Sequence, residues 1–191
     1  MADAELARRS PSPTAARGAT RAEGFTLVEL LVAFAILAVL VTAASVGYRQ
    51  AKLRTAETAA VTALNAINQA QFAYMQSCGN GRYAPTLVAL GTPVPGSPHG
   101  FLTADLTVSD PLLKSGYIFQ MSGTEAAAGE QTCTNLVPLE RYRLTADPHA
   151  PGATGVLFYG TNTDRVVYRD TQSFADNMPE AGPPGHGAEI R

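Results

Sequence analysis

Residues 25–48 read FTLVELLVAFAILAVLVTAASVGY, and Glu29 is the one charged residue in this run. As a helix, the run is about 36 Å long at about 1.5 Å per residue, which is enough to cross a hydrocarbon layer of about 30 Å. A secretory signal has a shorter apolar core, of about 7–15 residues. A buried core helix is the other alternative. We predict that residues 25–48 span a membrane.

The residues on either side of this run are basic. Residues 1–24 contain two prolines, four arginines and no apolar period, which predicts a disordered N-terminal targeting segment. Arg49, Lys52 and Arg54 follow the run closely. The difference in Lys and Arg between the two sides is therefore too small to predict the orientation of the span.

The helical pattern continues through residues 49–77. Apolar residues recur there in steps of three and four, which predicts an amphipathic helix with one buried face. No proline lies between residues 14 and 84, and Gly79 and Gly81 provide a stop. We predict one helix from about Phe25 to about Ser77. The predicted buried stripe is Leu53, Ala56, Ala60, Ala63, Ile67, Ala70 and Tyr74.

Residues 78–170 have the character of loops and short strands. Five prolines in 79–115 exclude long elements there, with a helical turn expected at Leu87–Leu90. Apolar alternation predicts strands near 117–121 and 142–146, and a hairpin is expected from 155–160 and 165–169, joined by the loop 160–164. Residues 171–191 are expected to form a flexible tail. The predicted fold class is α+β, a long N-terminal helix packed on a small antiparallel sheet of three to four strands.

The stretch Gly24-Phe25-Thr26-Leu27-Val28-Glu29-Leu30 resembles the cleavage and methylation motif of type IV prepilins and of type II secretion pseudopilins. The order of basic leader, apolar span, amphipathic helix and small sheet resembles the same family over the whole chain. The resemblance implies that residues 1–24 are a prepilin leader. It also implies that cleavage falls between Gly24 and Phe25, that the new Phe25 amine is methylated, and that Glu29 is the acid used in assembly.

The resemblance further implies the partners and the location. The partners are a prepilin peptidase, other pilin subunits in a helical filament, an inner-membrane assembly platform and membrane lipid. The chain is expected to cross the bacterial inner membrane once, with its C-terminal domain in the periplasm, and then to enter a pilus or pseudopilus. A structural role follows, and neither an enzyme nor a cofactor is expected.

Glu29 has a physical rationale that does not depend on the family. An acid in the middle of a membrane helix costs on the order of 2.5–3.5 kcal/mol, so such groups usually pair or serve a function. Cleavage after Gly24 would create a cationic amine on Phe25, one helical turn away. In a bundle of helices, the carboxylate of one subunit can pair with the amine of a neighbour. The alternative is that Glu29 only extends its side chain to the membrane surface.

The two cysteines, Cys78 and Cys133, form an even pair that follows a membrane span. This arrangement predicts one disulfide in an oxidising compartment. Two buried free thiols are the alternative.

Other residue types give weaker signals. His99, His149 and His186 lie in separate loops, which does not favour a metal site. Asn162 and Asp164 suit a calcium site or, as we prefer, a turn. No motif for a nucleophile and its base is present.

The charge does not favour nucleic-acid binding. The formal net charge is −2, and removal of the leader leaves an acidic chain. A basic strip at Arg141, Arg143, Arg165 and Arg169 is more simply explained as a solvated face of the sheet. The alternative function is a membrane-anchored binding or sensor domain in which the span is a simple tether and the leader is not cleaved.

Overall fold

The structure, a computed structural model, describes residues 24–190, with the backbone alone described at 44–46. Of the predicted leader, residues 1–23 lie outside the described residues. The chain divides into two compact units between Ala43 and Ala44. The first unit holds the apolar run up to Ala43, and the second holds the end of that run, the amphipathic part of the helix and the sheet.

The long helix α1 runs Leu27–Ser77, close to the predicted range. In the second unit the predicted stripe is buried from Ala60 to Tyr74, whereas Leu53 and Ala56 are half-buried. Leu64, which the helical period places at the edge of the stripe, is fully buried. The helix ends at Ser77, and the turn that follows contains Gly79, where a Cβ would lie 1.9 Å from the carbonyl oxygen of Arg82. Only glycine therefore fits at this turn.

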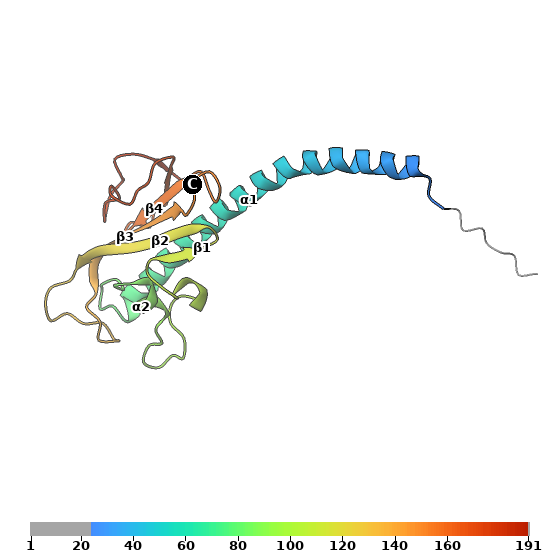
Figure 1. The fold of residues 1–191 in the computed structure, drawn as a ribbon. Coiled ribbons are helices and arrows are strands. Elements are labelled where there is room, and N and C mark those ends of the chain that lie inside the picture. The colour runs from blue at the N-terminus through green and yellow to red at the C-terminus, as the bar shows by residue number, and fades with distance from the viewer. Residues whose placement is uncertain (1–23, 191) are drawn as a thin grey trace, which may run out of the picture. The chain divides into compact units, whose positions relative to one another are not determined.

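The second unit contains a six-stranded sheet in which each strand pairs antiparallel with the next along the chain. In Figure 1 strands β1–β4 lie along the C-terminal part of α1. The predicted α+β class is confirmed. The strands are β1 (Leu112–Lys114), β2 (Tyr117–Glu125), β3 (Leu139–Pro148), β4 (Phe158–Asn162), β5 (Tyr168–Asp170) and β6 (Ala188–Glu189), and two short helices, α2 (Leu87–Gly91) and η1 (Ala104–Leu106), precede them.

The sheet differs from the prediction in strand number and in the hairpin loop. Six strands replace the expected three to four, because β1 and β6 are only three and two residues long and show no alternation. Strand β4 extends through Asn162, so the loop expected at 160–164 begins only at Thr163. Thr161 and Asn162 look like loop residues in the sequence, but both are fully buried and hydrogen-bonded.

Buried polar side chains fix α1 on the sheet. Asn68 donates to Thr161 Oγ1 at 2.9 Å and accepts from the Tyr142 hydroxyl at 2.9 Å. Burial raises the pKa of Tyr142 well above its ordinary value, so the phenol stays protonated and donates. One turn along, Gln71 accepts from Ala84 N at 2.8 Å and donates to Ala84 O at 3.1 Å. A sliding movement of α1 would break all four bonds.

Gln71→Leu is expected to lower the free energy of unfolding by about 2–3 kcal/mol, because Ala84 is left with a buried N–H and a buried C=O that have no partners. Denaturant unfolding of the full chain in detergent micelles measures this. Gln69, two residues away on the same helix, is exposed and serves as the matched control. Gln69→Leu should change stability by less than about 0.5 kcal/mol. Equal effects of the two substitutions would contradict the assignment.

The disulfide predicted from the cysteine pair is present between Cys78 and Cys133, 55 residues apart. It joins the end of α1 to the connection between β2 and β3. The backbone N–H of Cys133 also donates to the carbonyl of Cys78 at 2.8 Å.

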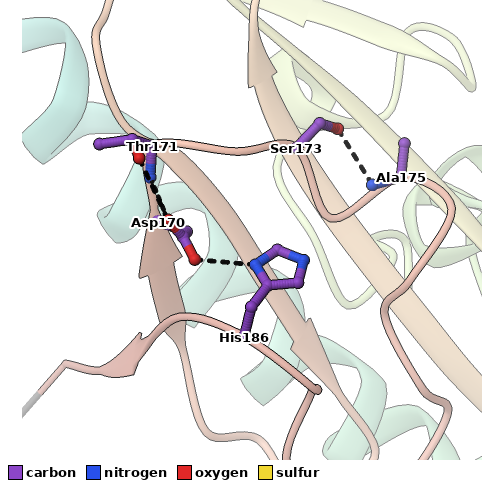
Figure 2. Close-up of polar contacts among 5 residues, drawn as sticks. All are labelled: Asp170, Thr171, Ser173, Ala175 and His186. Atoms are coloured by element: carbon purple, nitrogen blue, oxygen red, sulfur yellow. Dashed lines mark hydrogen bonds and ion pairs between the residues drawn. The ribbon is translucent and has the colours of Figure 1, made fainter.

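The segment expected to be a flexible tail is packed on the sheet over its described residues, 171–190. Phe174 and Met178 are fully buried, although the segment has too few apolar residues to show a period. His186 contacts Asp170 at 2.8 Å between Nδ1 and Oδ2, as Figure 2 shows. Its ring also stacks on Phe174, with 4.7 Å between ring centroids. A few individual side-chain contacts therefore hold this segment on the sheet, and they leave no repeating apolar pattern in the sequence.

The Asp170–His186 contact predicts a dependence on pH. The hydrogen bond from His186, followed by that from Thr171 N, lowers the pKa of the Asp170 carboxyl. A lowered folded-state pKa means that ionised Asp170 stabilises the fold above its unfolded pKa, about 3.9, and that this stability is lost as the pH falls through the folded value. The local stability of residues 171–190 should therefore decrease below about pH 4.

His186→Ala should raise the pKa of Asp170 and increase hydrogen exchange across 171–190. NMR titration of the carboxyl and hydrogen–deuterium exchange measure the two effects. His149→Ala is the matched control, because His149 is exposed in the described structure and its ring makes no hydrogen bond there. An unchanged Asp170 titration in His186→Ala would refute the prediction.

Candidate processing and assembly site

The N-terminus of α1 is closed by a reciprocal pair of side chains. Thr26 precedes the first helical residue, and its Oγ1 accepts from Glu29 N at 3.2 Å. Glu29 Oε2 in turn accepts from Thr26 N and from Thr26 Oγ1, both at 2.9 Å. This is a capping box, which satisfies two N–H groups that a helix terminus leaves without partners. The carboxylate is thereby held beside the helix N-terminus, where the helix dipole favours negative charge.

The sequence contained a signal for this cap. Thr-x-x-Glu directly before an apolar run is the pattern of a capping box. Sequence reasoning assigned Glu29 from its charge and did not identify Thr26 as its partner.

The two Glu29 oxygens are used unequally. Both bonds from Thr26 go to Oε2, and within residues 24–190 no group donates to Oε1. One oxygen therefore holds the local cap while the other is available to a further donor. The bonds to Thr26 and an external contact do not exclude each other.

The residues at the predicted cleavage point precede the helix. Gly24 and Phe25 have no regular structure, and Phe25 is 85% exposed. No atom lies within 4 Å of the place where a Cβ on Gly24 would be. The peptide between these residues is accessible in the described structure.

The apolar side chains that follow are exposed on all faces of α1. The helix contains a stretch long and apolar enough to cross a membrane, and none of that stretch is buried in the described structure. In water such a surface would be unstable, so lipid or other helices must cover it. The large exposed side chains are Leu27, Val28, Leu30, Leu31, Val32, Phe34, Ile36, Leu37, Val39, Leu40 and Val41.

The side chains considered for calcium hold a loop in place. Asn162 Nδ2 donates to the carbonyls of Pro179 and Gly182, at 3.1 and 2.7 Å. Asp164 Oδ2 accepts from Gly182 N at 2.6 Å, and Asp164 N donates to Asn162 Oδ1 at 3.1 Å. Within residues 24–190, no three His, Cys, Asp or Glu side chains are grouped as metal ligands would be.

The four arginines considered as a basic strip have different environments. Arg143 donates to Ser122 Oγ and to the carbonyl of Met178. Arg165 lies over the Phe72 ring, 4.2 Å from its centroid. Arg141 and Arg169 are exposed. Two of the four cations thus serve contacts within the fold.

The comparisons with known proteins concern the N-terminal site. Residues 20–45 match the prokaryotic N-terminal methylation motif, which contains Gly24, Phe25, Thr26 and Glu29. This motif is the signature of type IV pilins and pseudopilins, and it is carried here by a chain with the pilin-like order of long helix and antiparallel sheet. No curated protein and no solved structure matches the chain.

Proposed function

We propose that this chain is a structural subunit of a type IV pilus or of a type II secretion-like pseudopilus. Its leader is cleaved after Gly24, the amine of Phe25 is methylated, and the subunits polymerise through their apolar helices. The observation that carries the proposal is the methylation motif at residues 20–45, with a single acid, Glu29, in the apolar run.

Processing requires a peptide that a peptidase can reach. The exposed and non-helical Gly24–Phe25 peptide meets this requirement. The helix begins at Leu27, only two residues after the new N-terminus. Cleavage therefore leaves the capping box of Thr26 and Glu29 intact and places a charged amine next to it.

Before assembly the apolar half of α1 anchors the chain in the inner membrane, with the sheet unit in the periplasm. The disulfide between Cys78 and Cys133 supports this location, because such bonds persist in oxidising compartments. The prepilin peptidase and the assembly platform would act on the chain from within the same membrane.

Assembly replaces lipid around the apolar helix with neighbouring helices. The methylated amine of a neighbouring subunit donates a hydrogen bond to Oε1 of Glu29, while Oε2 keeps its bonds to Thr26. Two charges that would each be costly in an apolar environment then compensate each other. Because this contact is head-to-tail, repetition gives an open helical filament.

Mass spectrometry of the chain from its native membrane tests the proposal. The expected N-terminal peptide begins at Phe25 and carries one methyl group on its amine. An intact leader would overturn the proposal and favour a tethered binding or sensor domain. Gly24→Leu should block cleavage, whereas Gly47→Leu, at an exposed position within α1, should not.

A further inference from the structure

A cleft in the second unit contains two cations close to the end of the apolar run. Arg49 and Lys52 line it together with Tyr48 and Leu53 from α1, and residues 152–153 form the opposite wall. Its volume is about 560 Å³. This site is separate from the cap at Glu29 and is not part of the methylation motif at residues 20–45.

The wall opposite α1 is a well-defined turn between β3 and β4. Thr154 N donates to the carbonyl of Ala150 at 2.9 Å, and Thr154 Oγ1 accepts from Ala150 N at 3.0 Å. Gly152 has a φ of +81° and closes the turn through a 2.8 Å bond to the carbonyl of Gly155. A Cβ on Gly155 would lie 2.0 Å from the Tyr117 hydroxyl, so the turn is seated directly on the sheet. The cleft is therefore formed before any ligand arrives.

The two cations lack acidic partners. Within residues 24–190, neither Arg49 nor Lys52 makes an ion pair or a hydrogen bond through its side chain. The next acid along α1, Glu57, is already used, because its Oε1 accepts from the N–H groups of residues 156 and 157 at 3.0 and 3.4 Å. Within the described residues, the lining of the cleft contains no acid. The cleft consequently has a net positive charge.

The place of the cleft along the chain indicates what it meets. Arg49 directly follows the last residue of the apolar run, so insertion of that run brings Arg49 and Lys52 to the headgroup layer. Tyr48 is 71% exposed, and an amphipathic aromatic ring at this level is typical of a membrane interface.

We propose that this cleft binds the phosphate of an anionic lipid headgroup. The Arg49 guanidinium presents a planar fork that suits phosphate oxygens, and the Lys52 ammonium adds a point charge. The proposal rests on the membrane anchoring described above, and it does not depend on cleavage or on filament formation.

Fluorescence quenching by brominated lipids tests this site in the full chain. The chain contains no tryptophan, so Tyr48→Trp introduces a single probe beside the cleft. The protein is reconstituted in vesicles of phosphatidylglycerol and phosphatidylcholine in equal amounts, with bromine on one lipid or on the other. Stronger quenching by brominated phosphatidylglycerol is expected. Each of the two cations should contribute about fivefold to the preference for phosphatidylglycerol over phosphatidylcholine.

Arg49→Gln and Lys52→Gln, added to the probe chain, should each remove about fivefold of that preference. Arg141→Gln is the matched control, because Arg141 is an exposed cation on β3, outside the cleft. Equal quenching by the two lipids, or a preference that survives both substitutions, would overturn the lipid site while leaving the anchoring intact. Quenching by neither lipid would show that the apolar run does not insert, which overturns the anchoring as well.

Discussion

Glu29→Ala should abolish filaments while leaving the amount of chain in the membrane unchanged. Without the carboxylate, the amine of a neighbouring Phe25 enters the apolar bundle with no counter-charge. The cost of such an uncompensated group is about 2.5–3.5 kcal/mol, which corresponds to roughly 100-fold in the association of each subunit. Filaments sheared from cells and quantified beside the membrane fraction measure the effect.

Glu29→Gln separates the two roles of this side chain. Glutamine also closes a capping box, so the bonds to Thr26 are retained while the charge is lost. If charge pairing drives assembly, Glu29→Gln should be as defective as Glu29→Ala. Normal filaments from Glu29→Gln would show that the cap alone matters, and normal filaments from Glu29→Ala would refute an assembly role. Glu57→Gln, a charge loss on the same helix in the second unit, should leave the association through the apolar helix unchanged.

Removal of the disulfide should have the largest effect on folding stability. The double substitution Cys78→Ala and Cys133→Ala removes the bond that closes a loop between two residues 55 positions apart in the sequence. Chain entropy predicts a loss of about 4 kcal/mol for a loop of this size. The loosened region should be the connection between β2 and β3, where Cys133 N also donates to the carbonyl of Cys78.

Denaturant unfolding of the full chain in detergent micelles measures this loss. Reductant should destabilise the natural chain by a similar amount and should leave the double variant unaffected. A double variant as stable as the natural chain would contradict the prediction. Two reactive thiols in the protein from its native membrane would show that the bridge does not form there.

The sequence was most informative where a pattern repeats along one element. The apolar run at 25–48 and the three-four spacing that follows it predicted α1 nearly to its ends. Glu29 stood out because it is the one charge in an apolar stretch. The even pair of cysteines correctly predicted the disulfide. Each of these inferences uses neighbours within one element, or a residue type that has few chemical options.

The predictions from the sequence were wrong where contacts between segments far apart in the chain determine the structure. Strand β6 is two residues long and exists because residues 171–187 bring it back to β5. Phe174 and Met178 are isolated apolar residues in a stretch rich in glycine and proline, and the sequence does not indicate that the sheet buries them. Thr161 and Asn162 resemble turn residues until Asn68 and residues 179–182 supply their hydrogen-bond partners.

By itself, then, the sequence determined the helix, its apolar and amphipathic halves, the acid near its start and the class of processing motif. Local periodicity and local chemistry are sufficient for these features. The tertiary structure alone decided the number of strands, the packing of the C-terminal segment and the cleft beside Arg49 and Lys52. These depend on which distant backbone groups are brought together, and no spacing along the chain encodes that.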